Sequence, residues 1–108
     1  DFVYIDDACQ AILIAASKYS GPDIINISSG QSVTIRHLVE TVAAVVGYSG
    51  KVVWDATKPD GQMKKSFDVT RMREWLGFEC KTPLEEGLLN TYDWFRSHRS
   101  EVRLSSTL

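Results

Sequence analysis

The chain has 108 residues, of which 44% are apolar and 24% are charged, and its formal net charge is −2. This length predicts one domain with a modest core, and this composition excludes intrinsic disorder. The slight negative charge argues against broad nucleic-acid binding, which needs a basic surface. No apolar run approaches the roughly 20 residues that span a bilayer, so we expect no membrane partner.

The first expected elements are a short strand over residues 2–5 and a helix over residues 8–16. Aromatic and β-branched residues favour the strand, and Asp6 or Asp7 is expected to cap the helix. The helix is apolar nearly all round, which is typical of burial on more than one side. In so short a chain, this predicts a surface that needs a partner.

A second strand is expected over residues 24–27, with brief pairing over residues 32–34. Apolar residues then recur at helical spacing from Ile35 to Val46, which predicts an amphipathic helix. Thr34 is its expected N-cap, and Gly47 its expected stop.

The second half begins with an expected strand over residues 51–54, followed by a polar loop. Residues 67–69 form a short extended piece, and a helix opens at Asp68 or Thr70 and runs through Leu76. Gly77 is expected to end that helix.

The last helix is predicted by a capping box, Thr82-Pro83-Leu84-Glu85, in which Thr82 caps and Glu85 reaches back. Residues 101–108 have no periodicity and are expected to form a flexible tail after a substrate-binding domain over residues 1–100. The order of elements gives an α/β fold class, with short strands and about four helices.

The two cysteines, Cys9 and Cys80, lack CxxC spacing. They predict free thiols in a reducing compartment, the cytoplasm, rather than a zinc site or a disulfide. The chain opens without Met, and we expect it to be part of a longer protein.

The polar loop between residues 54 and 69 is the most informative segment for function. Asp60 lies between Pro59 and Gly61, where a carboxylate can accept hydrogen bonds from ligand hydroxyls. The alternative is a turn Asp that bonds its own backbone. Lys65 can reach a ligand phosphate as a point charge, and the alternative for it and Lys64 is full solvation. Strand alternation favours Lys65 over Lys64 as the ligand-binding residue, because Lys65 would share a strand face with Phe67.

Catalytic machinery is not found in the sequence. There is no Gly-rich dinucleotide or phosphate loop and no nucleophile elbow. Lys18 and Tyr19 are adjacent rather than four apart, so they do not share a helical face. We therefore assign no catalytic, cofactor-binding or metal-binding residue to this chain.

Several segments resemble the extended short-chain dehydrogenases/reductases, specifically the C-terminal part of the NAD-dependent sugar epimerase/dehydratase group. Two positions depart from the family pattern: Ser28 replaces a glycine, and His37 replaces an acid. The matching segments, in family order and spacing, are Phe2–Ala8, Ile25–Gly30, Thr34–Leu38, Val46–Gly50, Lys58–Gly61, Phe67–Arg71, Gly87-Leu88, Thr91-Tyr92 and Trp94-Phe95.

The resemblance implies that Asp60 contacts a nucleotide-sugar and that Lys65 lies at or near the same site. It also implies a Rossmann half upstream, which binds NADP or NAD and carries the Tyr-x-x-x-Lys pair and the epimerising Cys and His. Cys9 and Cys80 therefore do not inherit that epimerising role. The fragment alone should be inactive.

Three interpretations remain open from the sequence. The parent is an epimerase/reductase acting on a GDP-sugar, an epimerase or dehydratase acting on a UDP- or dTDP-sugar, or the chain is a non-catalytic interaction module. Because the first helix leaves apolar surface exposed, we also expect self-association into a homo-oligomer.

Overall fold

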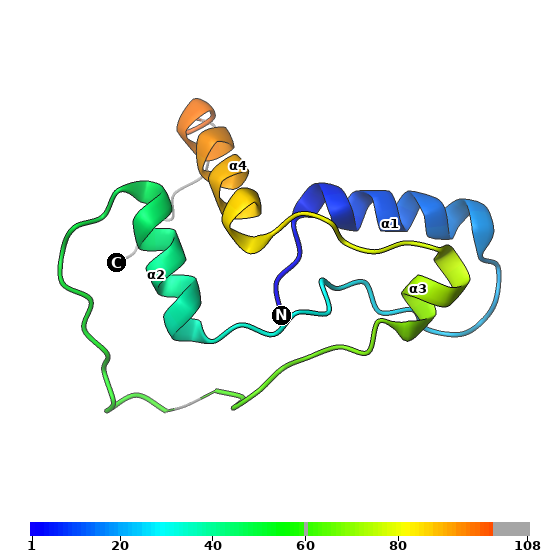
Figure 1. Cartoon of the computed structure of the whole chain (residues 1–108), viewed down its shortest axis with the longest axis horizontal. Coiled ribbons are helices and arrows are strands. Elements are labelled where there is room, and N and C mark those ends of the chain that lie inside the picture. The colour runs from blue at the N-terminus through cyan, green and yellow to red at the C-terminus, as the bar shows by residue number, and fades with distance from the viewer. Residues whose placement is uncertain (60, 101–108) are drawn as a thin grey trace.

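The computed structural model describes residues 1–59 and 61–100. Four helices form in these ranges: α1 (Ile5–Lys18), α2 (Ile35–Val46), α3 (Thr70–Leu76) and α4 (Leu84–Ser97). Figure 1 shows long outstretched segments between them. Helix α1 packs on α3, and α2 packs on α4. The Cα radius of gyration is 16.9 Å, against about 13 Å for a compact domain of this length, so the arrangement is open.

No strand forms within the described residues, although strands were expected over residues 2–5, 24–27 and 51–54. The pairing expected over residues 32–34 is also missing, and Ile5 already belongs to α1. A strand needs a hydrogen-bonded neighbour, which β-branched composition cannot supply by itself. The expectation of about four helices is confirmed, whereas the β part of the α/β class is not shown.

Helix α1 begins without a side-chain cap. Tyr4 occupies the N-cap position and its side chain makes no capping hydrogen bond, so the expected cap by Asp6 or Asp7 is wrong. Both acids lie in the first turn, where a negative charge stabilises the helix by interacting with the positive end of its dipole. Asp7 is only 8% exposed because it faces a distant segment of the chain. Its Oδ2 accepts the backbone N–H groups of Lys81 and Thr82, at 3.1 and 2.9 Å.

Helix α2 has the predicted ends. The Thr34 side chain accepts the backbone N–H of His37 at 3.1 Å, and Gly47 closes the helix with a φ of 71°. Helix α3 ends in the same manner at Gly77, with a φ of 63°. Both glycines occupy the left-handed region, which side chains with a Cβ rarely adopt.

The starts of α3 and α4 are set in different ways. The Oδ1 of Asp68 accepts the backbone N–H of Thr70 at 2.9 Å, so Asp68 orders the chain just before α3. For α4, the expected cap by Thr82 is wrong: Pro83 is the N-cap, and no side chain caps this helix. The Thr82 N–H is instead donated to Asp7.

The buried core lies between α1 and α3. Fully or nearly buried apolar side chains there are Ala11, Val69, Met72, Leu76 and Phe78, and residues of the 25–27 segment pack against them. At one end of this unit, Tyr19 stacks on Trp75 with ring centres 5.5 Å apart. The Lys18 ammonium also donates to the Leu76 carbonyl at 3.3 Å.

Apolar surface remains open outside this core. Helix α1 exposes Ile5 by 65%, Ile12 by 57% and Leu13 by 70%, as expected for a helix that is apolar nearly all round. Helix α2 contains no buried residue. None of the described helices is both long and apolar enough to cross a bilayer. The expected tail over residues 101–108 lies outside the described residues.

Candidate functional site

A cavity of about 590 Å³ opens at the N-terminal end of α2. One wall is the segment that leads into α2, and the other is the end of the polar loop. It combines the side chains of two lysines, the carboxylate of Asp1, two hydroxyl groups, one amide group and apolar surface. The residues that line it are Asp1, Phe2, Ser32, Val33, Thr34, Ile35, Gln62, Met63, Lys64 and Lys65.

Lys65, the expected phosphate ligand, lies on this cavity wall. Its ammonium is 5.5 Å from the centre of the Phe67 ring, so the two side chains are in contact, although no strand forms there. Phe67 is 40% exposed and is not a core residue, so Lys65 lies against a half-exposed ring rather than at the edge of the core.

Lys64 also lines the cavity. In a strand, the two adjacent lysines would have pointed to opposite faces, but no strand forms over these residues. Both lysines are nevertheless lining residues of the same cavity. Two ammonium groups in one cavity attract a multiply charged anion more strongly than either does alone.

Asp60, the other expected site residue, lies outside the described residues. The start of its loop is ordered by Asp55, whose carboxylate accepts the hydroxyl and the backbone N–H of Thr57, at 2.6 and 3.0 Å. The Thr57 hydroxyl, and then its N–H, lower the pKa of Asp55 below its usual value. This carboxylate stays charged near neutral pH and is occupied by the loop itself.

Sequence reasoning missed the polar groups opposite the lysines. Ser32 and Thr34 lie about thirty residues before Lys65 and share the cavity with it. Thr34 was assigned only as a helix cap, which it is. The available signal was the concentration of hydroxyl and amide side chains just before an amphipathic helix, a common position for ligand contacts.

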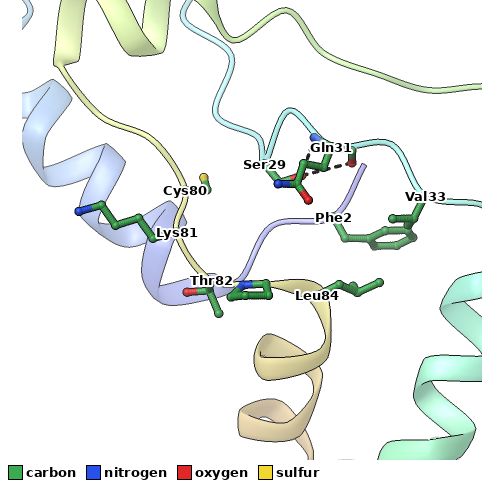
Figure 2. Close-up of a pocket in the computed structure, with 9 residues that line it drawn as sticks. Phe2, Ser29, Gln31, Val33, Cys80, Lys81, Thr82 and Leu84 are labelled. Atoms are coloured by element: carbon green, nitrogen blue, oxygen red, sulfur yellow. Dashed lines mark hydrogen bonds between the residues drawn. The ribbon is translucent and has the colours of Figure 1, made fainter.

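A second cavity, of about 100 Å³, lies where the chain before α4 crosses the segment before α2. Figure 2 shows Ser29 and Gln31 joined by two hydrogen bonds, while the Lys81 side chain points away from them. The Ser28 hydroxyl accepts the backbone N–H of Gly30 at 3.2 Å. These hydroxyl groups are therefore engaged in local turn contacts with the backbone.

The thiols of Cys9 and Cys80 are both free. Cys80 is partly buried and donates to the Ser28 carbonyl at 3.3 Å. Burial, and then the charge of Asp7, raise the pKa of the Cys80 thiol, which makes it less nucleophilic at neutral pH. No group of three potential metal-ligating side chains occurs in the described ranges.

The sequence of the chain was compared with family models and with known proteins. No family model matches the chain. A protein from Oryza sativa subsp. japonica named probable GDP-L-fucose synthase 1 is 43% identical over 95 residues. GDP-L-fucose synthase 1 from Arabidopsis thaliana is 45% identical over 95 residues. In both, the match covers 88% of this chain and 29% of the relative.

A bacterial relative agrees with the plant proteins. GDP-L-fucose synthase from Escherichia coli (strain K12) is 48% identical over 79 residues, covering 73% of this chain and 24% of the relative. The chain thus spans less than a third of the length of these relatives. The motifs identified above resemble those of GDP-L-fucose synthases, and the comparisons confirm that resemblance. The chain belongs to the extended short-chain dehydrogenase/reductase family and corresponds to the C-terminal part of its members.

Proposed function

We propose that this chain is the nucleotide-sugar-binding part of an NAD(P)-dependent epimerase/reductase of the GDP-L-fucose synthase type. The observation that carries the proposal is the presence of both Lys64 and Lys65 on the wall of one cavity. A nucleotide-sugar carries a diphosphate, and ammonium groups bind its oxygens through charge-assisted hydrogen bonds. The names of the relatives point to a GDP-linked sugar.

The remaining cavity groups suit the uncharged parts of such a ligand. Ser32 and Thr34 offer hydroxyl groups, and Gln62 offers an amide, all of which pair with sugar hydroxyls. We assign Asp60 as a further acceptor for ligand hydroxyls, on the Pro-Asp-Gly sequence and the family resemblance alone. Its carboxylate would add the direction-specific bonds that the lysines do not provide.

The rest of the enzyme is proposed to lie in a longer polypeptide. That part would bind NADP or NAD and carry the reacting groups, and this chain alone would turn over no substrate. The apolar face of α1, with Ile5, Ile12 and Leu13 exposed, would pack against it, because isolated apolar surfaces of this kind favour association. In isolation, the same face would drive formation of a homo-oligomer. We expect the protein to be cytoplasmic.

The site is tested by single substitutions in the full-length protein that contains this chain. Lys65→Ala and Asp60→Ala should each raise the KM for GDP-4-keto-6-deoxymannose about tenfold, the loss expected for one charge-assisted hydrogen bond. The affinity for NADPH should stay unchanged. Lys51→Ala is the matched control, because Lys51 is exposed and outside the cavity.

Two outcomes would change the proposal. If Lys65→Ala and Asp60→Ala bind the GDP-sugar as tightly as the unaltered protein, the site assignment is wrong. If a panel of nucleotide-sugars shows tighter binding of UDP- or dTDP-linked sugars, the activity is that of another member of the family. A protein that binds no nucleotide-sugar would favour an interaction module.

A further inference from the structure

A half-exposed tryptophan and an arginine form a cation–π pair near the N-terminal end of α2, where the lysine-lined cavity opens. Arg36 lies in the first turn of α2, and its guanidinium carbon is 5.3 Å from the centre of the Trp54 ring. Trp54 is 49% exposed. Neither residue belongs to the buried core. In the described ranges, Arg36 makes no ion pair, so packing within the chain leaves this pair without a clear structural task.

A second arginine–tryptophan pair in the same molecule gives the contrast. Arg71 lies over Trp75 at 4.9 Å, but it also donates to the Ile24 carbonyl at 2.8 Å and approaches Asp23 at 3.8 Å. Trp75 in turn stacks on Tyr19. That pair joins α3 to the segment after α1 and has an evident structural role, which Arg36 and Trp54 lack.

The position of the Arg36–Trp54 pair suggests its role. Arg36 directly follows Ile35, which lines the cavity, and Trp54 lies against Arg36. The Arg36–Trp54 pair therefore lies near the end of α2 at which the two lysines line the cavity. The Arg36–Trp54 pair offers flat aromatic and guanidinium surfaces, and the two lysines offer positive charge.

We propose that Trp54 and Arg36 form the stacking platform for the base of the nucleotide whose diphosphate is held by the lysines. This inference rests on the proposed function. A nucleoside diphosphate has a flat aromatic base at one end and an anionic diphosphate at the other. Bases stack on tryptophan rings and on guanidinium planes, and such stacking tolerates different bases. The platform therefore contributes affinity for the nucleoside rather than selection of one base.

The test compares GDP with inorganic pyrophosphate, which has no base, as ligands of the full-length protein. Trp54→Ala should weaken GDP binding about tenfold, the size of effect that loss of one stacked base gives, and leave pyrophosphate binding unchanged. Trp54→Phe, which keeps a ring, should bind GDP within about threefold of the unaltered protein. Arg36→Ala should weaken GDP binding less than Trp54→Ala does. Trp94→Ala is the matched control, because Trp94 is 56% exposed on α4.

The outcomes separate this inference from the proposed function. Trp54→Ala that leaves GDP binding unchanged, or that weakens pyrophosphate binding as much as GDP binding, overturns the platform. Lys65→Ala should weaken both ligands; if it weakens neither, the proposed function fails, whatever Trp54 does. Loss of GDP binding in Trp54→Ala with recovery in Trp54→Phe supports the platform and excludes general unfolding as the cause.

Discussion

The two helix pairs differ in how much of their own surface they bury. The α1–α3 pair encloses the buried apolar side chains, with Met72 and Leu76 each only 1% exposed. Among the described residues of α2 and α4, the only buried one is Gly87, which has no side chain. Apolar grooves of about 230 and 280 Å³ remain open along it. One pair is stabilised within this chain, whereas the other is arranged to be completed from outside.

The largest predicted effect tests where the core lies. Leu76→Ala, in α3, should lower the free energy of unfolding by about 3 kcal/mol, because it leaves a cavity in a packed core. The matched change Leu89→Ala, at a 47% exposed position in α4, should cost less than about 0.5 kcal/mol. Urea titration followed by circular dichroism measures both. Equal losses would show that the core is shared by the two pairs.

A somewhat smaller effect is expected at the contact that ties α4 to the α1–α3 pair. Asp7→Ala removes the acceptor of two backbone N–H groups and should lower the free energy of unfolding by about 2 kcal/mol. Asp6→Ala, one position earlier and exposed, is the control and should change little. Hydrogen exchange should also show faster exchange of the Lys81 and Thr82 amides in the Asp7 variant alone. Unchanged protection there would contradict the assigned role.

Each helix pair contains a helix that ends at a left-handed glycine, Gly77 after α3 and Gly47 after α2. The same substitution can therefore be compared in both pairs. Gly77→Ala and Gly47→Ala both place a Cβ in the left-handed region, which costs about 1 kcal/mol. We expect Gly77→Ala to shift the main urea transition and Gly47→Ala to loosen only α2, because α2 contains no buried residue. Equal shifts of one urea transition by both changes would contradict this and show that the two pairs unfold together.

The smallest predicted effect depends on pH. The hydroxyl of Thr70, and then its N–H, lower the pKa of Asp68 below its ordinary 3.8. A carboxyl whose pKa is lower in the folded than in the unfolded state stabilises the fold fully at any pH above its unfolded-state pKa. This stabilisation is lost as the pH falls through the folded-state pKa. Asp68→Asn should therefore be less stable than the unaltered chain near pH 7, and the difference should narrow below about pH 4. A difference that widens on acidification would contradict this assignment.

The helices could be predicted from the sequence because their determinants are local. Residues 35–46 follow one apolar period between a capping threonine and a stopping glycine, and α2 has those bounds. The end of α3 at Gly77 follows from the same reasoning. The strands could not be predicted in this way, because a strand depends on a partner, and residues 51–54 have none in the described chain.

The candidate site was only partly predictable for a related reason. Lys65 was identified from its own loop, but the wall that faces it comes from residues 32–35, which no local pattern connects to it. Asp7 shows the same limit. Its position suggested a helix cap, and only the contact with Thr82, 75 residues away, gives its actual role. Asp60 remains a prediction.

The unpaired segment before the polar loop affects how the isolated chain will behave. Val52, Val53 and Trp54 are 44%, 74% and 49% exposed and are flanked by Lys51 and Asp55. Charged flanks ordinarily keep such segments apart. Here, antiparallel alignment of two copies about Val53 would set the lysine of one against the aspartate of the other, a favourable cross-strand pair. The flanking charges would thus guide aggregation in one register, and added salt, by screening them, should slow it.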